Sequence, residues 1–331
     1  MLNIGLAGLK GHQSVILEGL SKLPNVRLAA VADDNPAALA GVPHWPAAGK
    51  TTHCYSDWRE MLQQEELDLV GVCGTDGERA EVLIAGAERG LHLLSEKPLA
   101  MSLDELASVR RAVAAGGVRL SMLLTMRFEP AYRVIREQVA AGRIGEVVLA
   151  SMAKSYRLGD RPEWQRDRRT FSGIIPFIGI HALDLIRWTT GREFTAVMAY
   201  QSNAAHPEIR DMEDNASLAL KLDNGGSACV RLDYCRSAAA PTHGDDRLRI
   251  AGSAGVIESV ACGAGVTLIT GDEPPHDLPL PPPENQFVDY VNALLAGREC
   301  GVPAEDCFRL TEVALKGREA AVRGTPMALG I

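Results

Sequence analysis

Three features are scarce or missing in this 331-residue sequence, and each absence excludes a class of protein. No apolar run approaches the ~18 residues that a transmembrane helix needs. Lys and Arg number 34 against 42 Asp and Glu, so the net charge of −8 repels phosphate backbones. The seven cysteines are scattered without a C-x-x-C pair, which favours reduced thiols over a disulfide framework or a zinc ribbon. We therefore expect no membrane partner, no nucleic-acid partner and no metal.

The chain start and the length set the next expectations. Residues 1–10 contain no basic region, and Lys10 interrupts their apolar run, so we expect no signal peptide and a cytoplasmic protein. At roughly 150 residues per domain, the length predicts about two domains.

The first ~120 residues alternate short apolar runs with amphipathic segments, which is typical of a parallel sheet flanked by helices. The spacing of Asp57 and Glu60, and of Ser102 and Glu105, predicts capping boxes at two helix starts, and Gly116-Gly117 can end the second helix. The predicted strands are Asn3–Ala7, Val26–Ala32, Leu69–Cys73, His92–Ser95 and Arg119–Leu123.

The pattern changes after Leu124. A helix is predicted over 130–141, a long strand over 146–156, an irregular charged stretch over 157–169, and a helix beginning near Pro176. Residues 216–222 and 228–234 alternate apolar and polar side chains, and Asn224-Gly225-Gly226 between them predicts a hairpin. Two further helices, over about 284–295 and 304–323, follow a Pro-rich connection. The fold class is therefore α/β, with a mostly parallel sheet first and an α+β domain with a large, open, largely antiparallel sheet second.

Glycines follow the first predicted strand in the run Gly5-Leu-Ala-Gly8-Leu-Lys10-Gly11-His12. Such a strand-to-helix turn allows a pyrophosphate to approach the backbone at the start of a helix. The match to a dinucleotide fingerprint is incomplete, but Asp33 ends the second strand, where a carboxylate can bind a ribose diol. Asp34 adds a charge that would oppose a 2′-phosphate, which favours NAD over NADP. A glycine-rich turn without a ligand, beside a solvated acidic turn, is the alternative.

Two other segments carry candidate chemistry. Lys97 follows the strand His92–Ser95, at the edge where parallel sheets bind ligands, and Pro98 fixes its backbone. In the helix predicted from Pro176, Phe177, His181, Asp184 and Trp188 fall within roughly 40° of one another at ~100° per residue. His181 is suited to accept a hydroxyl proton near neutral pH. A buried structural histidine beside Asp184 is the alternative.

Taken together, the motifs resemble those of the Gfo/Idh/MocA oxidoreductases, typified by glucose-fructose oxidoreductase and inositol dehydrogenase. The resemblance covers essentially the whole chain and rests on the glycine turn, Leu94-Ser-Glu-Lys-Pro-Leu-Ala100, Arg127-Phe-Glu-Pro-Ala-Tyr132, Gly142-Arg-Ile-Gly-Glu146 and Gly179-Ile-His-Ala-Leu-Asp184.

The resemblance implies a Rossmann domain over 1–123 that binds NAD or NADP, and a substrate-binding and oligomerisation domain over 124–331. It implies that Lys97 orients substrate and nicotinamide and that His181 accepts the proton. The residues expected to contact the cofactor are Gly8, Lys10, Gly11, His12, Asp33, Thr75, Glu96 and Lys97.

The sequence departs from this family at two places. Relatives that oxidise inositols and sugars usually carry Asp four residues before the histidine, where this chain has Phe177. Either the substrate presents an apolar surface there, or another acid such as Asp160 or Asp184 supplies the carboxylate, or dehydrogenase activity is lost. The stretch Gly74–Arg79 also replaces a Thr-Pro-Asn turn and its following His, which leaves the cofactor contacts of this turn open.

The expected substrate contacts combine these residues with the charged stretch, although a solvated loop is the alternative for the latter. They are Lys97, Arg127, Lys154, Tyr156, Arg168, Phe177, His181 and Asp184. The expected reaction is hydride transfer between NAD and a secondary alcohol or ketone of a sugar, polyol or related compound. A redox-neutral NAD-dependent glycosidase and a non-catalytic dinucleotide sensor remain alternatives. The mixed outer face of the second sheet needs either water or a second subunit, and the resemblance implies a homodimer or homotetramer, because relatives bury the corresponding face against a neighbour.

Overall fold

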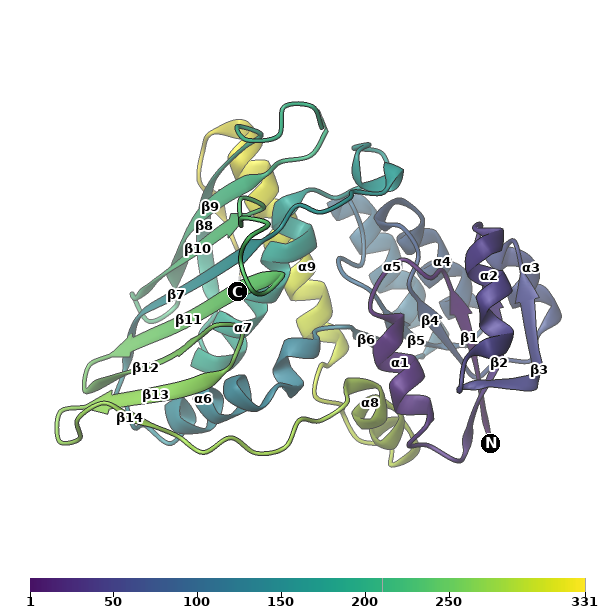
Figure 1. The fold of residues 1–331 in the computed structure, drawn as a ribbon, viewed down its shortest axis with the longest axis horizontal. Helices are drawn as coiled ribbons and strands as arrows, with labels where there is room; N and C mark the ends of the chain where they lie inside the picture. The colour runs from purple at the N-terminus through teal and green to yellow at the C-terminus, as the bar shows by residue number, and fades with distance from the viewer. Residues whose placement is uncertain (210, 331) are drawn as a thin grey trace. The chain divides into compact units, whose positions relative to one another are not determined.

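The computed structural model describes residues 1–209 and 211–330, which form two compact units (Figure 1). The first unit contains Met1–Leu124 and Asn285–Thr311, and the second contains Thr125–Glu284 and Glu312–Ile331. The chain thus returns to the first unit after leaving it, a feature that a single division after residue 123 does not include. The functional domain limits stay a prediction.

The first unit is built on a six-stranded parallel sheet in the order β3-β2-β1-β4-β5-β6. This is the strand order of a doubly wound dinucleotide-binding fold, so the predicted Rossmann architecture is confirmed. The strands are β1 Leu2–Ala7, β2 Val26–Ala32, β3 Ala48–Tyr55, β4 Leu69–Val72, β5 His92–Ser95 and β6 Leu120–Met122. The helices are α1 Gln13–Leu20, α2 Pro36–Gly41, α3 Trp58–Gln64, α4 Asp76–Glu88, α5 Leu103–Gly116 and α8 Gln286–Leu295, and α9 spans Ala304–Arg323.

The predicted capping box is present at the start of α5, whereas α3 has only part of the predicted one. Ser102 accepts the backbone N–H of Glu105, whose side chain completes the capping box, and Gly117 ends α5 with φ of 61°. Asp57 caps α3 by accepting the N–H of Arg59 rather than that of the third helical residue. These caps fix where each helix meets the ends of the strands.

The second unit is built on a nine-stranded sheet in the order β14-β13-β12-β11-β7-β10-β9-β8-β15. Its pairs are antiparallel except for β7 with β10, which confirms the predicted largely antiparallel sheet. The strands are β7 Val147–Tyr156, β8 Phe194–Ser202, β9 Asn215–Leu222, β10 Ser227–Asp233, β11 Gly244–Gly252, β12 Gly255–Val260, β13 Gly265–Thr270, β14 His276–Asp277 and β15 Met327–Ala328.

The two faces of this sheet differ as the sequence alternation predicts. Leu218 on β9 and Val230 on β10 are buried, whereas Ala219 and Cys229 between the buried positions are exposed. Helices α6 (Pro130–Ala140) and α7 (Ile180–Thr190) lie along one face (Figure 1). Apolar side chains of that face therefore form the core of the second unit.

The prediction of an α-helix from near Pro176 is wrong for the first turn. Residues Ile175–Gly179 form a π-helical turn, and α7 begins only at Ile180. Because a π turn is wider than an α turn, the ~100° step holds for His181 and Asp184 but does not extend back to Phe177. Phe177 is therefore presented by a different backbone geometry from that of His181.

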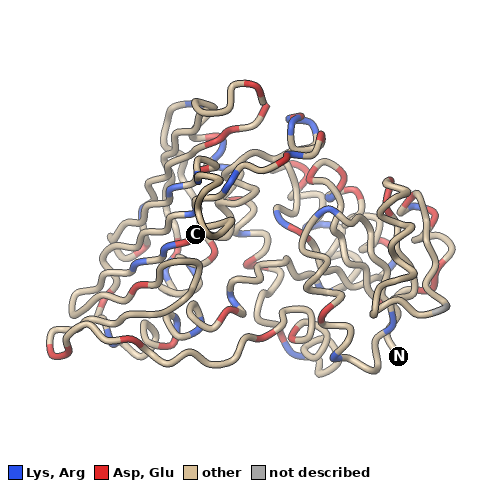
Figure 2. The backbone as a smooth tube through the Cα atoms, in the orientation of Figure 1, with Lys and Arg blue, Asp and Glu red and all other residues tan. Residues whose placement is uncertain are grey.

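Lys and Arg positions are spread along the backbone of both units and are interspersed with Asp and Glu (Figure 2). Among the described residues, no helix combines the length and apolar character that crossing a membrane requires.

Candidate functional site

The turn after β1 brings two backbone segments into close contact. Gly8 has φ of 88°, and a Cβ added to it would lie 2.3 Å from the Cα of Gly74 in the turn after β4. Its N–H donates to the carbonyl of Ala32 at 2.7 Å, and the N–H of Lys10 donates to that of Cys73 at 2.8 Å. The turn therefore requires glycine at position 8 and bridges the carboxyl ends of three strands.

A cavity of about 270 Å³ opens at these strand ends, within the first unit. It brings together the predicted residues Gly8, Lys10 and Asp33 and adds Asp34 beside them. Ligands of doubly wound sheets bind at this edge. The cavity is therefore the candidate nucleotide site.

The adjacent carboxylates of Asp33 and Asp34 differ in burial and in the groups that they contact. Asp33 is buried and accepts the backbone N–H groups of Leu9 at 2.7 Å and Asn35 at 2.8 Å, which ties the glycine turn to the end of β2. Asp34 is exposed and accepts a hydrogen bond from Lys10 Nζ at 2.5 Å. This contact lowers the pKa of Asp34, so the carboxylate stays ionised.

Glu96 links the glycine turn to β5. It is buried and accepts hydrogen bonds from the backbone N–H of His12 and, at 2.7 Å, from His12 Nδ1. A Cβ on Gly11 would lie 2.3 Å from Glu96 Oε1, so glycine is required there as well. Burial alone would raise the pKa of Glu96, but the charge and hydrogen bond of His12, together with Lys97, hold it well below its usual range.

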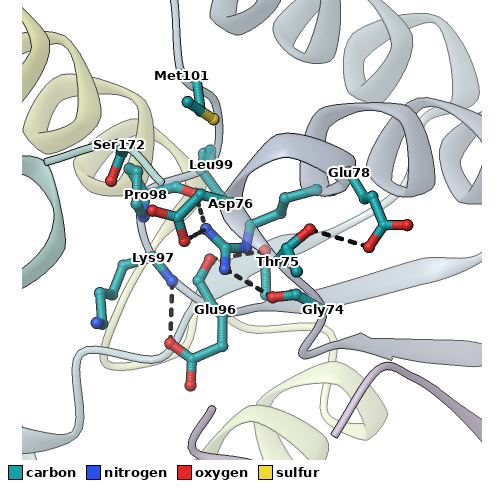
Figure 3. A network of polar contacts seen from close by, with 12 residues as sticks. Gly74, Thr75, Asp76, Glu78, Glu96, Lys97, Pro98, Leu99, Met101 and Ser172 are labelled. Carbon is teal, nitrogen blue, oxygen red and sulfur yellow. Dashed lines mark hydrogen bonds and ion pairs between the residues drawn. The ribbon is translucent and has the colours of Figure 1, made fainter. Parts of the chain in front are cut away.

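Lys97 directly follows Glu96, just beyond the end of β5 (Figure 3). Its side chain is buried. Its backbone N–H donates to Glu96 Oε2 at 3.2 Å, and a cis peptide bond joins it to Pro98. Arg79 of α4 donates to the carbonyls of Pro98 at 2.7 Å and Gly74 at 3.0 Å. The backbone around Lys97 is thus connected to the turn that lines the cavity.

Arg79 is held in turn by Asp76, with Nη1 and Oδ1 3.0 Å apart and both side chains buried. Thr75 directly precedes α4, and its hydroxyl donates to Glu78 Oε2 at 2.9 Å (Figure 3). Thr75 is a predicted cofactor contact, whereas the sequence alone predicts no role for Arg79.

In the second unit, His181 lies in the first turn of α7 and is 7% exposed. One turn along, Asp184 forms a buried ion pair with Arg127, whose Nε lies 2.9 Å and Nη2 2.5 Å from Asp184 Oδ1. Asp184 and Arg127 therefore neutralise each other, one turn along α7 from His181. Their expected contact with substrate stays a prediction.

Phe177 belongs to an aromatic cluster that we define as Trp164, Phe171 and Phe177. The rings of Phe171 and Phe177 are 5.1 Å apart and edge-on, and Trp164 lies 5.9 Å from Phe177. Arg168, in the same stretch, pairs with the buried Glu213, which also accepts the N–H of Ile174 at 3.3 Å. The stretch expected as irregular is thus held by aromatic packing and by one buried acid.

Lys154 and Tyr156, both on β7, converge on Asp246 of the neighbouring strand β11. Lys154 Nζ lies 2.6 Å from Asp246 Oδ2, and the Tyr156 hydroxyl donates to the same oxygen at 3.1 Å. Burial and Asp246 raise the pKa of Tyr156. Asp246 is not among the predicted site residues, and its pairing with Lys154 follows from the strand register, in which the two residues lie opposite one another.

The chain is similar to known proteins along most of its length. A family model described as an oxidoreductase family with an NAD-binding Rossmann fold matches residues 2–124, and one described as the GFO/IDH/MocA C-terminal domain matches residues 132–258. A Thermotoga maritima protein of solved structure, described as an oxidoreductase, superposes with a TM-score of 0.92 at 30% identity, covering 99% of this chain and 100% of that chain.

Two curated relatives are named for their substrates. Inositol 2-dehydrogenase of Rhizobium meliloti is 24% identical over 328 residues, covering 97% of this chain and 96% of that enzyme. D-xylose 1-dehydrogenase (NADP(+)) 2 of Haloferax volcanii is 29% identical over 243 residues, covering 70% of this chain and 68% of that enzyme.

Proposed function

Because the chain belongs to the Gfo/Idh/MocA family of oxidoreductases, we propose that it transfers a hydride between NAD and a secondary alcohol or ketone of a sugar, polyol or related compound. The expected family and enzyme class, an NAD(P)-dependent dehydrogenase acting on CH–OH groups, are confirmed. The preference for NAD and the substrate class are the parts proposed here.

The observation that carries the cofactor proposal is the cavity where β1, β2 and β4 end. Side chains on Gly8 and Gly11 would collide with Gly74 and Glu96, so the glycines let the turn after β1 pack directly against the segments that follow β4 and β5. Asp33 at the end of β2 is suited to a ribose diol, and Asp34 adds negative charge beside it. These residues fit a dinucleotide whose ribose carries no 2′-phosphate.

When bound, the nicotinamide supplies the hydride acceptor or donor. We assign Lys97 to the orientation of the reacting oxygen, because an ammonium group stabilises developing negative charge on oxygen. We assign His181 to the exchange of the hydroxyl proton, which imidazole can accept near neutral pH. The assignments of Lys97 and His181 follow the family resemblance, and the side chains of both residues are buried.

The aromatic cluster favours a substrate with an apolar patch. Phe177 stands where related polyol oxidisers usually carry Asp, and its ring packs against those of Phe171 and Trp164. Neither Asp184, paired with Arg127, nor the exposed Asp160 contributes to this cluster. We therefore expect a compound with a deoxy, methyl or anhydro carbon rather than a fully hydroxylated polyol.

The test begins with mass spectrometry of any nucleotide that co-purifies. A screen of inositols, sugars, deoxy and anhydro sugars and sugar acids then follows the absorbance of reduced nicotinamide. We expect NAD-dependent turnover that Lys97→Met and His181→Asn each lower by at least a hundredfold, with NAD still bound by His181→Asn. Aglycone release without net NADH would instead identify the redox-neutral glycosidase, and NAD binding without any turnover would identify the sensor.

We also propose a homodimer or homotetramer formed through the outer face of the nine-stranded sheet. Ser217, Ala219 and Cys229 are exposed there on neighbouring strands, and the exposed Lys221 and Arg231 lie on the same face, which is therefore mixed in character. Light scattering after size-exclusion chromatography should give a multiple of 35.5 kDa, and the mass of one chain would contradict the proposal.

A further inference from the structure

The charged stretch after β7 contains an arginine whose charge no described acid neutralises. Arg161 lies between β7 and the short 3-10 helix Glu163–Gln165, and its side chain is half-buried. Its guanidinium carbon lies 4.0 Å from the centre of the Tyr234 ring, and its Nη1 donates to Gln165 Oε1 at 3.0 Å. Its Nε is buried and has no hydrogen-bond partner among the described residues. Burial lowers the pKa of Arg161, and Tyr234 rather than a carboxylate opposes this shift.

The other cations predicted to contact substrate in the second unit are neutralised by buried acids. The pairs are Arg127–Asp184, Lys154–Asp246 and Arg168–Glu213. A half-buried cation without a counter-ion is unfavourable, because it has lost part of its hydration and has gained no opposite charge. Of these four cations, Arg161 is therefore the one that an anion on a ligand would stabilise most.

Arg157 is the other arginine of the stretch without an acidic partner in the described part of the chain, and it is placed differently. It lies opposite Cys235 in an isolated bridge, and its Nη2 donates to the carbonyl of Ala240. Successive residues of a strand point to opposite faces, so Arg157 and the exposed Cys235 belong to the outer face, whereas Tyr234 belongs to the face that the helices cover. Arg157 therefore does not share the side of the sheet on which Arg161 lies.

The stacking partner Tyr234 places Arg161 on the face of the sheet that carries His181. Tyr234 directly follows β10 and is almost completely buried. It lies on the same face as Leu232 two residues earlier, and a Cβ on Gly179 would be only 2.7 Å from the Leu232 side chain. Gly179 ends the π turn from which α7 and His181 continue. The guanidinium of Arg161 therefore covers the sheet beside the segment that presents the predicted proton acceptor.

The aromatic cluster supports the same placement. Trp164 follows Arg161 by three residues and packs against Phe177, which lies in the same π turn four residues before His181. The side chains of the cluster are uncharged, so none of them repels an anion that approaches Arg161.

We propose that Arg161 binds a carboxylate of the substrate, which makes the substrate a sugar acid rather than a neutral sugar. The inference rests on the proposed dehydrogenase function and names its substrate class. A guanidinium has five N–H donors in a planar fork that matches a carboxylate, and the contacts of the described residues use only Nη1. Stacking on Tyr234 holds the fork in place. Because Lys154 and Arg168 are already neutralised, one unpaired cation suits a carboxylate monoanion better than a phosphate dianion.

The experiment measures the binding of acidic and neutral sugars by titration calorimetry, on the full chain saturated with NADH. The probe pairs are D-glucuronate with D-glucose and D-galacturonate with D-galactose, and D-glucose 6-phosphate tests a phosphate group. We expect the wild-type protein to bind at least one acid about tenfold or more tightly than its neutral partner, because hydrogen bonds between charged groups are the stronger ones. Arg161→Met should abolish this preference, and Arg161→Lys should restore part of it. Arg169→Met is the matched control, because it removes the same charge from the same stretch at a side chain that is 88% exposed.

The neutral sugars separate a binding role of Arg161 from a structural one. Arg161→Met should leave their dissociation constants within about twofold of wild type, and equal losses for neutral and acidic sugars would overturn the proposal. Three other results would do the same: a preference for acids that survives Arg161→Met, equal affinities within both wild-type pairs, or tighter binding of glucose 6-phosphate than of either acid. In these cases the dehydrogenase proposal still stands, provided that NAD is reduced in the presence of a neutral sugar.

If NADH does not bind, or if no sugar of either class binds, the proposed function fails together with this inference. Circular dichroism of each variant shows that a loss of binding is not a loss of folding.

Discussion

The ion pair of Arg127 and Asp184 offers a quantitative test of how the second unit is stabilised. Both side chains are almost completely buried, at 2% and 1% exposure, and Arg127 directs two nitrogens at the carboxylate. Asp184→Asn keeps the size of the side chain but leaves the guanidinium charge uncompensated in the interior. Breaking such a pair by removing one partner costs about 3–5 kcal/mol. We expect this loss in the free energy of unfolding.

The assay is urea unfolding followed by circular dichroism and tryptophan fluorescence. With an m-value of about 3 kcal/mol/M, the expected loss lowers the midpoint by about 1 M or more. Glu273→Gln is the control, because its partner Arg143 lies 2.7 Å away but both side chains are more than 40% exposed. Breaking that exposed pair should cost about 0–1 kcal/mol.

A double variant extends the test to the origin of the cost. Arg127→Met with Asp184→Leu removes both charges, so it should be less destabilising than the sum of the two single changes. Equal losses for Asp184→Asn and Glu273→Gln would refute the reasoning, since burial would then not determine the cost of an unpaired charge.

Three further outcomes follow from the same structure. Gly8→Ala would place a Cβ against the backbone after β4, so NAD affinity measured by calorimetry should fall more than tenfold, whereas Gly41→Ala, with open space around it, should retain it. Burial raises the pKa of Glu129 to about 7 from 4.5, so the folded protein holds a proton that the unfolded chain releases. Its stability should therefore fall as pH rises through this window, and Glu129→Gln should reduce the difference between urea midpoints at about pH 5 and about pH 8. Arg79→Met leaves Asp76 buried without its cation and should cost about 3–5 kcal/mol by urea unfolding.

Much of the fold could be predicted because its signals are local. The five predicted strands of the first unit are present, since buried parallel strands read as continuous apolar runs. Strand β3 (Ala48–Tyr55) was missed because an edge strand with residues such as Thr51, Thr52 and His53 carries no such run. The π turn over Ile175–Gly179 was also missed. The apolar pattern of these residues does not distinguish a π turn from an α turn. At Gly179 the turn packs closely, because an added Cβ would lie only 2.7 Å from the side chain of Leu232.

The candidate site was predicted where motif and geometry coincide. Gly8, Lys10 and Asp33 line one cavity because all three lie at the ends of adjacent parallel strands, a position that sequence order specifies. Lys154 and Asp246 were not connected, because a pair 92 residues apart depends on the register between β7 and β11. A lysine that the sequence predicts as a substrate contact can thus be neutralised by an acidic side chain on a strand far away in the sequence.

Lys10 and Lys154 are both predicted contacts of a ligand, but they differ in the burial of the acid with which each one pairs. Lys154 pairs with a buried Asp246. If Lys154 moved away to bind a ligand, the Asp246 carboxylate would lose its cation in the interior, at a cost of several kcal/mol. Lys10 pairs with an exposed Asp34, which water can solvate as soon as the lysine turns away. Burial of the partner, rather than that of the lysine alone, therefore decides which cation is available to a ligand. On this ground Lys10 is a better candidate for binding a charged ligand than Lys154.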